Sequence, residues 1–149
     1  YNIAVPHNII GPNQKYDDAF RNVASIMINL ILQNRSPTIY GDGTQTRSFC
    51  HIDDLVIGLT KLMNSNSNIL YPVNLGNPDE FSLLELVDEI ENISKKELTI
   101  EFQPLPMDDP KMRRPDIRIA KNDLGWKPSI KLSDGLIDTY KYFLNELKK

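Results

Sequence analysis

Apolar residues recur at spacings of three and four in several stretches of the chain, a pattern typical of helices that bury one face. Residues 20–33 form one such stretch, and Asp17 and Asp18 precede it, where carboxylates suit a helix amino terminus. A second helix is predicted from Asp53, which can cap it, to Met63. The apolar positions expected to face inward from this second helix are Leu55, Val56, Leu59, Leu62 and Met63.

Three more helices are predicted in the second half of the chain. Ser82 and Glu85 have the spacing of a capping box, in which each side chain satisfies a backbone amide of the other residue. A short helix is expected at 117–124, stopped by Gly125. The last helix is expected to be capped by Ser133.

Short runs of β-type residues lie between these helices, so the sequence predicts an α/β fold. Strands 3–5 and 71–75 would normally join a larger parallel sheet, and in this chain we expect them to have exposed edges or a new partner. Residues 104–115 are predicted to be a proline-rich loop. The predicted strands are 3–5, 38–40, 47–51, 71–75 and 98–102.

Composition restricts the class of protein further. The chain has 149 residues, of which 40% are hydrophobic, enough for one globular domain. A net charge of −3 argues against a surface that binds nucleic acid. The single cysteine, Cys50, is consistent with a reducing compartment, so we expect a cytoplasmic protein, and the longest apolar run, 26–32, is too short to span a membrane. Because Tyr1 opens what looks like a strand already under way, we expect a truncated chain.

The sequence contains no recognisable motif for catalysis or metal binding. The chain contains no Gly-x-Gly-x-x-Gly and no P-loop sequence. His7 and His51 are far apart and have no carboxylate at metal-ligand spacing, so we predict no metal site. No nucleophile with a histidine or acid partner is indicated by a local motif, so we predict no catalytic residue in this chain.

Candidate anion-binding residues are more numerous. Arginine matches phosphate oxygens with two parallel hydrogen bonds, and Arg47 follows a glycine-rich turn that would fix its position. Tyr40 could offer an aromatic face to a base, although without further context the residues favour an ordinary strand tyrosine. A basic segment could close over a phosphate, or it could be a solvated loop that balances Asp108 and Asp109. Its members are Lys111, Arg113, Arg114, Arg118 and Lys121.

Several motifs in the same order give a resemblance to a known family. They are PHNIIGP at 6–12, IYGDGTQTRSF at 39–49, DDL at 53–55, NLGN at 74–77, an arginine pair before Pro115 and Asp116, and LGWKP at 124–128. Together they resemble the extended short-chain dehydrogenase/reductases, in the NAD-dependent epimerase/dehydratase family. The closest resemblance is to its UDP-glucuronate decarboxylase, dTDP-glucose dehydratase and UDP-glucose 4-epimerase branches. The resemblance implies that 1–149 is the carboxy-terminal, nucleotide-sugar-binding portion plus the last strands of a Rossmann-type parallel sheet.

The resemblance also implies a role for individual residues. His7 would lie against the nicotinamide end of NAD, and Arg21 would reach the cofactor or the sugar. Asn8 and Asn22 would lie near the sugar and diphosphate. The remaining implied substrate-binding residues are Thr38, Ile39 and Tyr40 at the base, Arg47 at the diphosphate, and Arg114 with Asp116 in a loop that closes over the phosphate or ribose.

Two motifs of the family do not occur in these 149 residues: the glycine-rich NAD loop and the catalytic Tyr-x-x-x-Lys. We therefore expect a chain that binds a UDP- or dTDP-sugar, that has NAD as the cofactor of the complete enzyme, and that is inactive alone. The alternative is a non-catalytic sugar-nucleotide-binding or regulatory module. Nucleic-acid binding is disfavoured because no set of stacking aromatics accompanies the basic segment. A homodimer stays open, and no membrane partner is expected.

Overall fold

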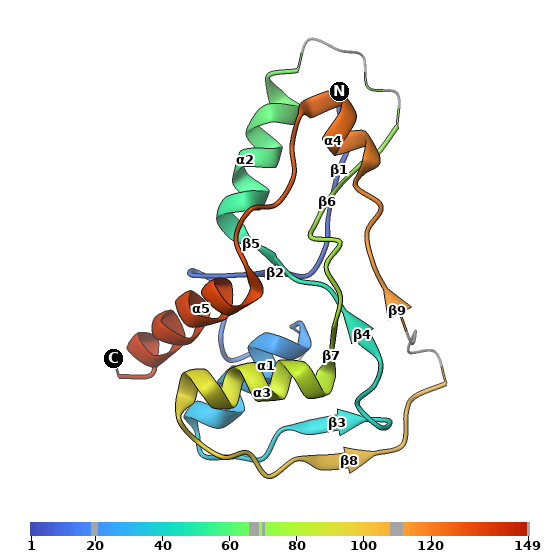
Figure 1. Cartoon of the computed structure of the whole chain (residues 1–149). Coiled ribbons are helices and arrows are strands. Elements are labelled where there is room, and N and C mark those ends of the chain that lie inside the picture. Colours follow the sequence, from blue (N-terminus) through green and yellow to red (C-terminus); the bar gives the residue numbers. More distant parts are fainter. Residues whose placement is uncertain (19–20, 66–68, 70, 108–111, 149) are drawn as a thin grey trace.

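The computed structural model describes residues 1–18, 21–65, 69, 71–107 and 112–148 (Figure 1). Helices alternate with short strands, which confirms the predicted α/β class. The helices are α1 (Val23–Leu32), α2 (Ile52–Met63), α3 (Leu83–Ser94), α4 (Arg118–Leu124) and α5 (Leu132–Glu146). The strands are β1 (Ala4–Pro6), β2 (Ile9–Ile10), β3 (Thr38–Tyr40), β4 (Thr46–Arg47), β5 (Cys50–His51), β6 (Val73–Leu75), β7 (Phe81–Ser82), β8 (Glu101–Gln103) and β9 (Met112–Arg113).

The strands form small sheets in which most pairs are parallel. Strand β1 pairs with β6, β2 with β5, and β3 with β8, all in parallel. The two strands that the sequence left without a partner therefore pair with each other, with Val5 opposite Asn74. Their outer edges are not paired with any described residue. The fourth sheet places β4 between β7, which is antiparallel to it, and β9, which is parallel.

Two apolar clusters hold these elements together. The larger one is formed mainly by α1, α3 and α5, which pack against one another in the lower half of Figure 1. Phe143 of α5 and Ile39 of β3 are fully buried in it. The smaller cluster joins α2 and α4 to β1 and β6 around Trp126. Burial of this apolar surface is the main force that stabilises such short strands and helices.

Helix starts differ from the predictions at three places. Helix α1 begins at Val23, because the Asn22 side chain caps it by accepting from the Ser25 amide at 3.1 Å; predicted residue 20 lies outside the described residues. Helix α2 is capped by the ring of His51 rather than by Asp53, whose amide donates to that ring. No side chain caps α5, so the predicted cap at Ser133 is wrong.

Other expectations were confirmed or corrected by the packing. The capping box of Ser82 and Glu85 is present in full, and Gly125 ends α4 in the left-handed conformation. Val56 and Met63 point outward from α2, contrary to the prediction, with 50% and 81% of their surface exposed. Strands β6 and β8 begin two and three residues later than expected.

The predicted loop 104–115 contains strand β9, formed by Met112 and Arg113, which the sequence did not reveal. Residues 108–111 of that loop lie outside the described residues. Among the helices that the structure describes, none is both long enough and apolar enough to cross a membrane.

Candidate functional site

A cavity of about 420 Å³ opens between α1, β3 and β4. It brings together six residues that the sequence singled out, and they come from segments that lie far apart along the chain. Hydrophobic side chains of α1 and Phe49 form an apolar wall opposite the polar groups. The singled-out residues in its lining are Asn8, Arg21, Asn22, Thr38, Tyr40 and Arg47.

The pairing of β4 with β9 supplies the positive charge of this cavity. Arg47 on β4 and Arg113 on β9 are direct partners in the parallel register, and both line the cavity. The Arg47 guanidinium is oriented by a bond from its Nη1 to the Thr46 carbonyl at 2.8 Å. Two guanidinium groups on neighbouring strands form an arrangement suited to a group with two negative charges, such as a diphosphate.

The turn before β4 is held in place by a buried glutamine. Gln45 is 5% exposed, and its amide donates to the Tyr40 carbonyl, so the two ends of the turn are tied together. Asp42 accepts from the Thr44 amide at 3.0 Å within the same turn. Gly41 has a φ of 81°, which side chains rarely adopt, so the glycine is needed here. The turn thereby fixes the positions of Tyr40 and Arg47 on either side of the cavity mouth.

Strand alternation explains which residues of β3 reach the cavity. Thr38 and Tyr40 line it, whereas Ile39 is fully buried in the larger apolar cluster. Successive strand residues point to opposite faces, so all three residues cannot face one ligand. Tyr40 is 46% exposed and is free to lie against a planar group.

The two asparagines combine structural and site roles. Asn8 has a φ of 41°, and its side-chain amide donates to the Ser48 carbonyl at 3.0 Å. Asn22 donates to the Ile9 carbonyl at 2.8 Å while its oxygen caps α1. Both side chains are thus fixed at the cavity wall by bonds to the backbone.

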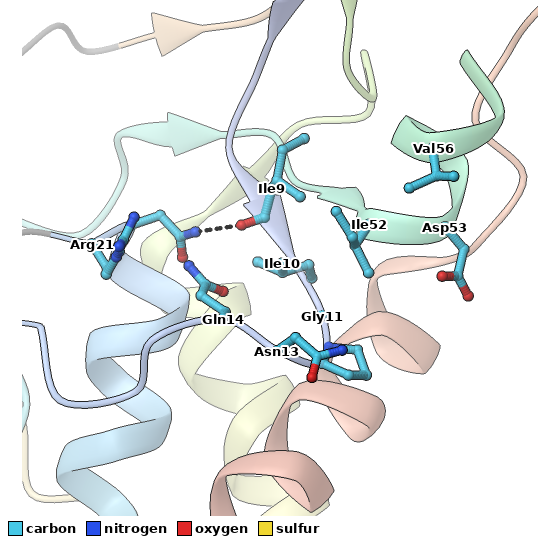
Figure 2. A pocket seen from close by; sticks show the side chains of 11 residues that line it. Ile9, Ile10, Gly11, Asn13, Gln14, Arg21, Ile52, Asp53 and Val56 are labelled. Atoms are coloured by element: carbon cyan, nitrogen blue, oxygen red, sulfur yellow. Dashed lines mark hydrogen bonds between the residues drawn. The ribbon is translucent and has the colours of Figure 1, made fainter. Parts of the chain in front are cut away.

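A second cavity, of about 670 Å³, adjoins the first and shares Arg21 and Asn22 with it. Figure 2 shows Arg21 on one side and Asp53 and Val56 of α2 on the other, with the 11–14 turn below them. Arg21 pairs with Asp18 at 3.2 Å. The shared arginine stands between the two spaces, where it could contact a ligand in either one.

His7 lies outside both cavities. Its Nε2 is 3.1 Å from the side-chain oxygen of Asn74, and a side chain at Gly76 would approach the His7 Cβ to 2.8 Å. This packing presents a half-buried imidazole at the end of the β1–β6 pair. The 149 residues contain no glycine-rich turn of the dinucleotide-binding type.

Arg114 and Asp116 are not brought to the nucleotide-sized cavity. Arg114 lies 3.8 Å from Glu80, and Asp116 binds Arg118 with two short bonds at 2.6 and 2.9 Å. Hydrogen bonds from Arg118 hold the pKa of the Asp116 carboxyl below its ordinary value. Arg113, next to Arg114 in sequence, lines the cavity instead. It belongs to the predicted basic segment, but the sequence does not distinguish it from Arg114, because a two-residue strand leaves no periodic signal.

No group of three or more histidine, cysteine, aspartate or glutamate side chains suited to a metal occurs in the part of the chain that the structure describes. The fold and the cavity thus define an α/β protein in which two arginines on paired strands line one cavity together with apolar side chains.

Comparison with known proteins gives the family. The model of the NAD dependent epimerase/dehydratase family matches residues 1–76, and the chain belongs to this family, as the motifs predicted. Its description makes the family NAD dependent, which confirms the NAD prediction at the level of the family. The match covers the segment that carries Asn8, Asn22, Tyr40 and Arg47.

The chain is similar to UDP-glucuronic acid decarboxylase 1 of Danio rerio, with 45% identity over 95% of this chain and 33% of that protein. It is also similar to UDP-glucuronic acid decarboxylase 6 of Arabidopsis thaliana, with 40% identity over 90% of this chain and 38% of that protein. The chain therefore spans about a third of the length of these relatives.

Two solved structures have a fold similar to that of this chain. The UDP-glucuronic acid 4-epimerase of Bacillus cereus, in complex with UDP-glucuronic acid and NAD, matches with a TM-score of 0.86 and 33% identity, over 98% of this chain and 45% of that one. The UDP-glucose 4-epimerase of Thermotoga maritima with UDP-glucose matches with a TM-score of 0.89 and 26% identity, over 99% of this chain and 47% of that one.

Proposed function

We propose that this chain binds the UDP-sugar of an NAD-dependent decarboxylase or epimerase and holds its diphosphate between Arg47 and Arg113. The observation that carries the proposal is the register of β4 and β9, which places these two arginines side by side in one cavity. A sugar nucleotide carries about two negative charges on its diphosphate, and charge-assisted bonds from two guanidinium groups match them. Asn8 and Asn22 offer further polar contacts at the same wall.

The apolar wall and Tyr40 suit the base of the nucleotide. Tyr40 is half exposed at the cavity mouth, with Thr38 beside it and Phe49 within. An aromatic ring next to a hydroxyl accommodates a pyrimidine by stacking and hydrogen bonding. Uridine is favoured over thymidine because the similar proteins named above are a UDP-glucuronic acid decarboxylase and two epimerases in complex with UDP-sugars.

We propose glucuronate as the sugar of the bound nucleotide, since the relatives with 45% and 40% identity are UDP-glucuronic acid decarboxylases. In the proposed complete enzyme, the glycine-rich loop that binds NAD and the catalytic acid–base pair belong to residues outside these 149. His7 and Arg21 would contact the cofactor or the reacting sugar from the side of this chain. We therefore expect the chain by itself to bind the substrate without converting it, and NAD-dependent turnover by the isolated chain would overturn this part.

Calorimetry on the 149-residue chain with UDP-glucuronate tests the binding site. Replacing Arg47 or Arg113 with alanine should weaken binding by roughly 1.5–3 kcal/mol, the range for a charged hydrogen bond. The matched control is Arg114→Ala, because Arg114 pairs with Glu80 outside the cavity and its loss should leave the affinity unchanged. A loss with Arg114→Ala and none with Arg113→Ala would show that the diphosphate lies elsewhere.

A further inference from the structure

Glu80 directly precedes β7, the strand that pairs with β4 on the side away from β9. Its side chain is 20% exposed, and both of its carboxylate oxygens face the neighbouring strands. Oε1 accepts from the Thr46 hydroxyl of β4 at 2.7 Å, and Oε2 lies 3.8 Å from Nη1 of Arg114, which follows β9. One carboxylate therefore connects the start of β7 to β4 and to the end of β9, which runs beside β4 in Figure 1.

The contacts of Glu80 lie on the face of the sheet opposite to the cavity. Arg47 and Arg113 line the cavity, whereas Thr46 and Arg114 are not part of its lining. Successive residues of an extended chain point to opposite faces, so Thr46 and Arg114 project away from the side on which the two cavity arginines lie. Glu80 thus contacts the sheet from behind the arginine pair.

Backbone pairing alone specifies the register of this sheet weakly. Strand β4 has two residues, and it forms two residue pairs with β7 and two with β9. A slip of one residue turns the side chains of a strand to the other face. For β4, such a slip would turn Arg47 out of the cavity and bring Thr46 into it. A side-chain bond that forms in the observed register therefore helps to keep Arg47 in place.

The two contacts of Glu80 differ in strength. The bond from Thr46 is 2.7 Å long, part-buried and accepted by a carboxylate, which places it among the stronger hydrogen bonds of proteins. The pair with Arg114 spans 3.8 Å, and the Arg114 side chain is 60% exposed, so solvent screens it. We therefore expect the Thr46 bond to carry most of the effect, in agreement with the unchanged affinity expected for Arg114→Ala.

We propose that Glu80 is a positioning residue for the sugar-nucleotide cavity, and that through Thr46 it fixes the register that places Arg47 beside Arg113. Glu80 does not line the cavity, so it acts through the sheet and not by contact with the ligand. Its effect on affinity rests on the proposed function, in which the arginine pair binds the diphosphate. The register itself is a property of the chain without a ligand.

Hydrogen exchange of the ¹⁵N-labelled 149-residue chain tests the register without a ligand. The Leu83 amide donates to the Gln45 carbonyl at 3.2 Å and reports on the pairing of β7 with β4. In Glu80→Ala and in Thr46→Val it should exchange about fivefold faster or more, because local opening becomes easier. Thr46→Ser, which keeps a hydroxyl, should retain the parent rate. The His7 amide, which bonds to Leu75 in the β1–β6 pair, is the internal control.

An unchanged exchange rate of the Leu83 amide in both Glu80→Ala and Thr46→Val would overturn the proposal. Equal acceleration of the Leu83 and His7 amides would also overturn it, because it would show a general loss of stability.

The affinity for UDP-glucuronate, measured by calorimetry, distinguishes positioning from charge. Removal of a negative charge near a site for a dianion should by itself strengthen binding. Positioning predicts the opposite for Glu80→Ala, a loss of about fivefold or more, with a similar loss for Thr46→Val. Glu80→Gln keeps an acceptor for Thr46, and Asp79→Ala removes an exposed carboxylate beside Glu80, so neither should weaken binding. Tighter binding by Glu80→Ala would refute the positioning role.

A combined variant shows whether Glu80 acts through Arg47. In the Arg47→Ala background, Glu80→Ala should cause no further loss of affinity, because the group that it positions is gone. A full additional loss would contradict the proposal. A parent chain that binds no UDP-glucuronate would refute the proposed function instead, and the exchange rates would then decide alone whether Glu80 fixes the register.

Discussion

At the scale of single residues, the cavity depends on which of two adjacent arginines faces inward. Arg113 pairs with Arg47 across the strands, while Arg114 turns to Glu80 on the other side. This separation follows from strand geometry, since successive side chains point to opposite faces. The neighbours Arg113 and Arg114 thus lie on two different surfaces, whereas Arg47 and Arg113, which are distant in sequence, line the same cavity.

Cys50 provides a prediction at the same scale. Its side chain is 1% exposed within the smaller apolar cluster, and burial together with the nearby Asp54 carboxylate raises the pKa of its thiol to about 12. Only the thiolate reacts with alkylating reagents, so the folded chain should resist iodoacetamide at pH 8. Mass spectrometry should detect modification in urea and almost none in buffer. Rapid labelling of the folded chain would mean that Cys50 is accessible.

The site could be predicted from the sequence only where a motif marks a fixed backbone. Asn8 has a positive φ, Asn22 is a helix cap, and Tyr40 and Arg47 are the strand residues that flank the glycine-containing turn; all four reach the cavity. Arg113 could not be distinguished from its neighbour, because its orientation depends on a long-range pairing with β4. The roles of all these residues in binding stay predictions.

At the scale of elements, local signals predicted the helices better than the strands. The spacing of apolar residues and the capping box place α3 correctly, since both act within a few residues. Strand β9 and the pairing of β1 with β6 depend on residues more than sixty positions apart, which no local pattern records. Helix α2 shows the same limit, because its cap is the ring of His51, which no local pattern favours over Asp53.

The capping box of α3 gives a prediction for stability. Ser82→Ala removes the acceptor of the Glu85 amide and should lower the free energy of unfolding by about 1 kcal/mol. Bonds from the Ser82 backbone amide and hydroxyl hold the pKa of Glu85 below its ordinary value of 4.5. Stability from a depressed carboxyl pKa is present above that ordinary value and is lost as the pH falls through the folded-state pKa.

Urea unfolding at pH 7 and pH 3, followed by circular dichroism, checks this expectation. The difference between the parent chain and Ser82→Ala should shrink at the lower pH, because the stabilisation by the Glu85 carboxylate is lost as the pH falls through its folded-state pKa. Ser94→Ala, at the other end of α3, is the control and should show little dependence on pH. A difference that stays constant or grows at low pH would contradict the role of Glu85.

At the scale of the whole molecule, the two apolar clusters are connected by the segment between α4 and α5. The segment after α4 runs from Trp126 in the smaller cluster to Leu132 in the larger one. Asp54 of α2 fixes its path: its backbone carbonyl accepts from the Trp126 indole, and its carboxylate accepts from residues 129 and 130. One buried aspartate therefore connects α2, α4 and α5.

Replacing Asp54 with alanine should accordingly destabilise the chain more than most surface changes. Two backbone amides in part-buried hydrogen bonds would lose their acceptor, at about 1–3 kcal/mol each, so we expect a loss of roughly 3 kcal/mol in the free energy of unfolding. Chemical denaturation measures this loss, and Asp53→Ala, beside it but with a side chain 74% exposed, should cost no more than about 0.5–1 kcal/mol. Equal effects of the two changes would contradict the connecting role of Asp54, because only its carboxylate is buried against the backbone of the segment that leads into α5.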